Sequence, residues 1–123
     1  MTRYMGLVRM EEGIAPPPQA LMDAMGDFIA TSVASGAFID GGGLFGTEDA
    51  INFVIADGGV TEVDGPYAEA KEIVGGWSLL EFETQEAAVE NAREMAQLHA
   101  DHWPDQKVVI TLRQIADGPD PAQ

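Results

Sequence analysis

The spacing of apolar residues predicts two helices, each with a recognisable beginning and end. Residues 19–34 repeat apolar side chains at helical intervals; Pro16–Pro18 leads into this segment and Gly36 follows it. A second helix is predicted to begin after Thr84, a good N-cap, and to run to about His102. Pro104 ends it, because proline cannot continue a helix.

The remaining apolar segments predict strands. Residues 3–10 are apolar on both faces, which favours a central strand, and residues 37–45 read as a strand interrupted by Gly41–Gly43. Three adjacent glycines in a strand indicate a bulge or a close backbone approach. Further strands are predicted at residues 50–56, 60–63, 74–82 and 107–115, with one or two helical turns over residues 68–73. The first two of these flank Asp57-Gly58-Gly59, a hairpin turn signal.

The order of these elements predicts an α+β fold of the split βαβ type with a hairpin insertion. Such a chain forms a four-stranded sheet, and its two helices can cover only one face. The first and last strands nevertheless carry further apolar residues on their opposite rows, namely Met5, Leu7, Val109 and Thr111. A second copy of the chain is the simplest cover for that face, so we expect a homodimer.

Composition narrows the classes of partner. The chain has 123 residues, enough for one domain, and 46% of them are apolar, which is typical of a folded protein. Its 21 acidic and 6 basic residues give a net charge of −15, which argues against nucleic acid and anionic membranes as partners. No residue is a cysteine, so disulfides and thiolate metal sites are excluded, and we expect no metal and no cofactor. With no signal peptide or membrane-spanning run recognised, the expected location is cytoplasmic.

Three blocks of residues resemble the YCII-related, or DGPF-domain, family. Asp64-Gly65-Pro66-Tyr67-Ala68-Glu69-Ala70-Lys71-Glu72 followed by Gly75-Gly76-Trp77 is similar to its D-G-P-F-x-E-x-K-E and G-G-[FYW] signature. The opening Tyr4-Met5-Gly6-Leu7-Val8 resembles its first strand, and His99-Ala-Asp-His102-Trp103-Pro104 resembles the H-x-x-H-W-P of one branch. The resemblance covers residues 3–115 as a single domain, with residues 116–123 as a flexible tail.

The resemblance implies a ferredoxin-like fold assembled as a dimeric α/β barrel. Most members have no assigned activity, some lie beside or are fused to extracytoplasmic-function sigma factors, and a distant branch contains a dehalogenating His–Asp enzyme. This chain departs from the signature at Tyr67, where phenylalanine is usual. It also has Pro18-Gln19-Ala20 where the catalytic branch has a histidine near the start of the first helix.

Two groups of residues are candidates for a site. His102, Asp64 and Glu72 are the candidate catalytic residues, since histidine and carboxylates exchange protons near neutral pH. Candidate ligand-binding residues are Lys71, Tyr67, Trp77, His99 and Arg9, with Lys71 suited to a small anionic ligand. A structural interpretation stands beside each of them: a turn at Asp64, a helix-end cap at His99 and His102, a core or interface anchor at Trp77, and an acidic partner for Arg9.

Two functions of different classes follow. The first is a dimeric small-molecule-binding module, in the family's context associated with transcriptional regulation. The second is a small-molecule enzyme, dehalogenase-like or lyase-like, that uses His and carboxylate acid–base chemistry. The missing histidine before the first helix favours the binding module. A buried pocket that holds both a histidine and a carboxylate within hydrogen-bonding reach would favour the enzyme.

Overall fold

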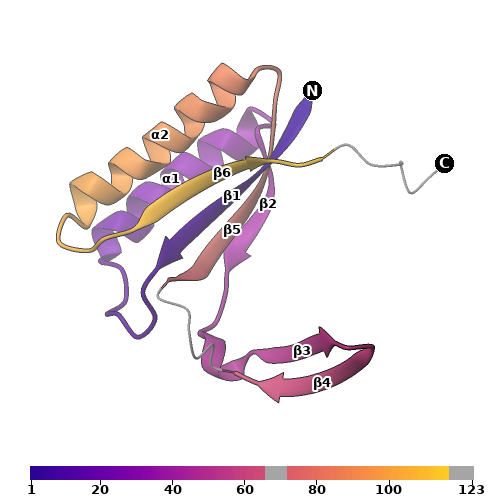
Figure 1. Ribbon diagram of the computed structural model, residues 1–123. Coiled ribbons are helices and arrows are strands. Elements are labelled where there is room, and N and C mark those ends of the chain that lie inside the picture. Colours follow the sequence, from indigo (N-terminus) through magenta and orange to yellow (C-terminus); the bar gives the residue numbers. More distant parts are fainter. Residues whose placement is uncertain (66–71, 117–123) are drawn as a thin grey trace.

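The structure, a computed structural model, describes residues 1–65 and 72–116 (Figure 1). Strands and helices follow one another closely along the chain. In chain order they are β1 (Thr2–Met10), α1 (Gln19–Ala34), β2 (Phe38–Gly43), the 3₁₀ turn η1 (Thr47–Asp49), β3 (Ile51–Ala56), β4 (Gly59–Asp64), β5 (Ile73–Phe82), α2 (Gln85–His102) and β6 (Val109–Gln114).

The main sheet contains four antiparallel strands in the order β2-β5-β1-β6. Each β-α-β crossover therefore passes over one intervening strand, which is the ferredoxin-like arrangement. Figure 1 shows α1 and α2 side by side against the same face of this sheet. The predicted α+β class, the four-stranded sheet and the single helical layer are confirmed.

Local signals explain where the two helices begin and end. Helix α1 has the predicted bounds, and after its C-cap Ser35 the chain leaves the helix through Gly36, whose φ is 85°. At the start of α2, the Thr84 hydroxyl accepts a hydrogen bond from the Ala87 N–H at 3.1 Å. Helix α2 ends at His102, and the N–H of its C-cap residue Trp103 donates to the His99 carbonyl at 2.8 Å.

The tightly packed core lies at one end of the helix–sheet layer. Tyr4, Leu80 and Ala88 are buried there, and partly buried apolar residues surround them: Phe38, Phe82 and Leu112. The Tyr4 and Phe82 rings meet edge to face with centroids 6.3 Å apart. This cluster includes residues from the start of β1 and the start of α2. It does not extend to the opposite end of the helix–sheet layer.

Strands β3 and β4 form a separate two-stranded sheet that projects from the main one (Figure 1). Its turn places Asp57 and Gly58 at φ 53° and 79°, the two positive values of a type I′ hairpin, as predicted. One face of this hairpin carries Ile51, Phe53, Ile55 and Val60, which are 61–77% exposed. An isolated two-stranded hairpin is marginally stable, and within the described chain nothing covers this surface.

The other face of the main sheet carries an apolar row of its own. Met5, Leu7, Leu79 and Val109 alternate with the helix-facing residues of their strands and are half-buried. Among the described residues, no helix covers this face (Figure 1). None of the described helices is both long enough and apolar enough to cross a membrane.

Two predictions about irregular segments have mixed outcomes. The predicted helical turns over residues 68–73 fall largely outside the described residues, but Ile73 belongs to β5 and is not helical. The reason is that Ile73 pairs with Met10 and extends the ladder between β1 and β5. The tail beyond residue 116 lies outside the described residues, so its flexibility stays a prediction.

Candidate functional site

A cavity of about 560 Å³ lies between the two helices and the main sheet. Apolar side chains provide most of its wall. From α1 they include Leu21, Met25, Phe28 and Ile29; from α2, Ala92 and Met95; and from the strands, Val8, Ile110 and Leu112. Cavities of roughly 300–1,000 Å³ with apolar walls are the usual sites for small molecules in proteins.

The floor of the cavity is made of residues with little or no side chain. Gly6 and Gly41 are paired with Ser78, and Gly43 is paired with Gly76, on the helix-facing side of three adjacent strands. Larger residues at these positions would fill the space beneath the helices. The cavity therefore exists because this part of the sheet surface is nearly bare backbone.

Of the two alternatives predicted for the glycines that interrupt β2, a bulge or a close approach, the structure has the close approach, at Gly41. The register of β2 against β5 shifts earlier, between Phe38 and Asp40. A Cβ on Gly41 would lie 2.7 Å from the Trp77 carbonyl oxygen and 2.6 Å from the Phe38 ring. Only glycine fits there without a backbone shift.

Polar groups in the cavity wall are few. Ser32 on α1 is 6% exposed, and Asn91 on α2 donates its side-chain N–H to the Ser32 hydroxyl at 3.5 Å. This contact connects the two helices above the cavity. Among the described lining residues none is Asp, Glu, Lys or Arg, so the described wall offers no carboxylate, ammonium or guanidinium group.

His99 is the one titratable residue in the described cavity wall, and its side chain is held by its own helix. The residue is 7% exposed. Its Nδ1 lies 2.8 Å from the Met95 carbonyl oxygen, one turn earlier in α2. A carbonyl can only accept, so Nδ1 carries the proton and donates it. In the neutral ring the other nitrogen, Nε2, is then a hydrogen-bond acceptor.

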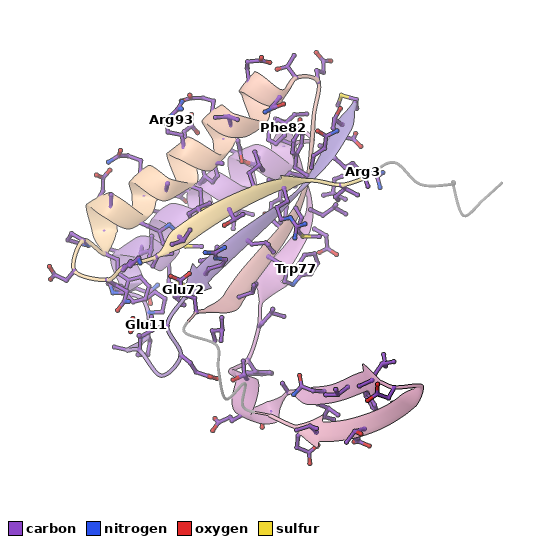
Figure 2. All side chains as sticks on the ribbon, viewed as in Figure 1. Arg3, Glu11, Glu72, Trp77, Phe82 and Arg93 are labelled. Atoms are coloured by element: carbon purple, nitrogen blue, oxygen red, sulfur yellow. The ribbon has the colours of Figure 1, made fainter. Side chains whose placement is uncertain are left out.

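Arg9 and Glu72, predicted as ligand-binding and catalytic residues, form an ion pair. Arg9 Nη2 lies 3.0 Å from Glu72 Oε2, and Lys107 Nζ lies 3.7 Å from Glu72 Oε1. Figure 2 shows Glu72 beside the ends of β1 and β6. The pairing of Arg9 with an acidic residue is thus confirmed. Arg9 Nε is buried and has no hydrogen-bond partner within the described residues.

Trp77 lies in the middle of β5 (Figure 2). It is one of the lining residues, but its indole Nε1 lies 3.8 Å from where a Cβ on Gly42 would stand. Gly42 alternates with Gly41 and Gly43, so the indole is on the sheet face away from the helices. An interface position therefore suits Trp77 at least as well as the floor of a pocket.

The remaining predicted residues are not brought together. Asp64 is exposed at the end of β4, and His102 is half-buried at the end of α2, outside the cavity lining. Within the described segments, neither of them forms a hydrogen bond or ion pair with Glu72, whose partners are Arg9 and Lys107. Tyr67 and Lys71 lie outside the described residues. Among the residues that are described, no group of three or more His, Asp or Glu side chains is placed to hold a metal ion.

The sequence analysis assigned Ser32 and Met95 no role at a site. It also missed the contribution of Asn91, Gly6, Gly43 and Gly76. One available signal was the crowding of glycine into three strands that were otherwise apolar. Glycine weakens a strand, so repeated glycines on one sheet face indicate space used for something else.

Comparison with known proteins gives one finding. A model of the YCII-related domain matches residues 2–110. Among curated proteins, none matches the chain.

Proposed function

Because the chain belongs to the YCII-related family, most members of which have no assigned activity, we propose a function from its cavity. The protein is a homodimeric module that binds a small, uncharged and largely apolar molecule between the helices and the sheet of each subunit. The observation that carries this proposal is the 560 Å³ cavity with its glycine floor.

The chemistry of the wall supports an uncharged ligand. An ion moved into an apolar cavity loses its hydration and must find a partner of opposite charge. The described lining offers neither a carboxylate nor a Lys or Arg side chain. The anionic ligand expected from Lys71 therefore stays a prediction for a residue outside the described part, and association with transcriptional regulation likewise stays a prediction.

The enzyme is the weaker of the two functions. Its criterion was a buried pocket with a histidine and a carboxylate within hydrogen-bonding reach. The cavity holds His99, but the described lining contains no Asp or Glu. A histidine alone in an apolar wall supports binding better than proton transfer, which needs a second group to orient or recharge it.

The dimer is supported by two apolar surfaces that lack a cover in the described chain. Met5, Leu7, Leu79 and Val109 line the sheet face opposite the helices. Packing two such faces together forms the dimeric α/β barrel that the family resemblance implies, and it leaves each cavity on the outer side of its own sheet. The apolar hairpin of β3 and β4 then lies free to pack against the second subunit.

Naphthalene is a suitable probe for the cavity, because it is uncharged, apolar and fluorescent. We expect it to bind the wild-type protein with one site per chain, as measured by fluorescence titration. Ala92→Phe places a ring into the cavity from α2, so binding should weaken at least about tenfold, equivalent to about 1.4 kcal/mol.

Ala96→Phe is the matched control. Ala96 lies on the same helix, is exposed and is not a lining residue, so this variant should bind naphthalene as the wild type does. Both variants keep the exposed apolar surface of the hairpin. Naphthalene that binds there would therefore bind both variants equally. Equal affinity of all three proteins, or no binding to the wild type, would refute the proposal.

A further inference from the structure

We infer that His99 selects the ligand by accepting a hydrogen bond at Nε2, so that the preferred ligand is an apolar molecule bearing one hydroxyl or N–H donor. This inference rests on the proposed function, since it assigns the chemical class that the cavity takes. It is carried by the position of His99 and by the hydrogen bond that its ring already makes.

In its neutral form, the ring of His99 accepts at Nε2 rather than donates there. Its Nδ1 donates to the Met95 carbonyl at 2.8 Å, which fixes the proton on that nitrogen. No described residue forms a hydrogen bond with Nε2. The residue is 7% exposed and belongs to the cavity wall, so on this inference a molecule in the cavity is the hydrogen-bond partner of Nε2.

One other pair of polar side chains around the cavity already forms a hydrogen bond. The Ser32 hydroxyl already accepts from Asn91, which connects the two helices above the cavity. His99 lies two turns further along α2 from Asn91, in a wall that is otherwise mainly apolar. A ligand with its donor at one end and its apolar body over the glycine floor satisfies both regions at once.

His99 discriminates between ligands because a bound ligand without a donor leaves its Nε2 without a hydrogen-bond partner. When an apolar analogue without a donor fills the cavity, it excludes water and leaves Nε2 buried without a partner. A ligand with a hydroxyl in the right place avoids that loss. His99 therefore acts less by adding affinity than by rejecting molecules that lack a donor.

The test compares 2-naphthol with naphthalene, which differ by one hydroxyl. We expect the wild-type protein to bind 2-naphthol about three- to tenfold more tightly than naphthalene. In His99→Leu the side chain becomes apolar, so the preference should disappear, while naphthalene binds as well as or better than in the wild type. This retained naphthalene binding also shows that the variant is folded.

His102→Leu is the matched control. His102 lies three residues further along α2 and is not in the cavity lining, so this variant should keep the full preference for 2-naphthol. If His99→Leu keeps the wild-type preference, or if His102→Leu loses it, the inference is wrong. In those cases naphthalene binding that is sensitive to Ala92→Phe still upholds the proposed function, so the two failures are distinguishable.

Discussion

Gly65 lies directly against Thr47: a Cβ built on Gly65 would overlap the Thr47 carbonyl oxygen. The Gly65 N–H also donates to the Ala50 carbonyl at 2.6 Å. Thr47 is in turn held by the Glu12 carboxylate, which accepts hydrogen bonds from the Thr47 N–H and hydroxyl. The glycine of the D-G-P signature thus joins the end of the hairpin to η1 and to the loop after β1.

Gly65→Ala should lower the free energy of unfolding by about 2–3 kcal/mol, because the methyl group forces the backbone of η1 to move. Urea unfolding at a fixed protein concentration measures this change. Gly26→Ala is the contrasting variant: Gly26 lies inside α1, and a Cβ there meets nothing within 4 Å. It should raise stability by about 0.5–1 kcal/mol. Equal effects of the two substitutions would contradict the role given to Gly65.

Val109→Asp should split the dimer or unfold the protein, because it puts an unpaired carboxylate into an apolar contact between sheet faces. Light scattering is expected to give about twice 13.1 kDa for the wild type. Val89→Asp is the control, since Val89 is 37% exposed on α2, which lies against the opposite face of the sheet. A wild-type protein that is monomeric at micromolar concentration would remove the basis for this prediction.

Phe53→Ser should weaken the dimer at least about tenfold if the hairpin packs against the second subunit, because burying a phenylalanine contributes about 1.5–3 kcal/mol. Sedimentation equilibrium gives the dissociation constant. Thr61→Ser changes the opposite face of the same hairpin and should leave that constant unchanged. An unaltered dimer in Phe53→Ser would show that another surface covers the hairpin or that it stays exposed.

Dialysis against a chelator should leave the melting temperature unchanged. The chain has no cysteine, and the described residues form no cluster suited to a metal ion. Differential scanning fluorimetry before and after dialysis makes the comparison. A fall of several degrees that one metal ion reverses would overturn the expectation of a metal-free protein.

Local patterns predicted the secondary structure well because its signals are local. The bounds of α1 follow from apolar spacing between Pro18 and Gly36, and the Thr84 cap and the turn at Asp57 and Gly58 depend only on neighbouring residues. The hairpin insertion outside a four-stranded sheet was also predicted, from the order of the elements along the chain. The order of the elements did not predict the contact between Gly65 and Thr47, which are far apart along the sequence.

The site was less predictable for a related reason. Gly6, Gly43 and Gly76 come from three strands, and only the strand order brings them onto one floor. His99 and His102 have the same chemistry and lie within one turn, so the sequence alone could not say which of them reaches the cavity. Their difference in burial arises from the rotation of α2 over the sheet, which only the packed structure determines.

Because the floor of the cavity lacks side chains, hydrogen exchange at the amides of the sheet depends on whether the cavity is occupied. Where side chains are missing, the peptide groups of Gly6 and Gly76, in the two central strands, are screened from solvent by whatever occupies the space above them. Deuterium uptake at these amides therefore depends on occupancy, through how often the ladder opens to water. An occupied protein would exchange slowly along the centre of the sheet and an empty one faster, so the strands that form the cavity also record whether it is filled.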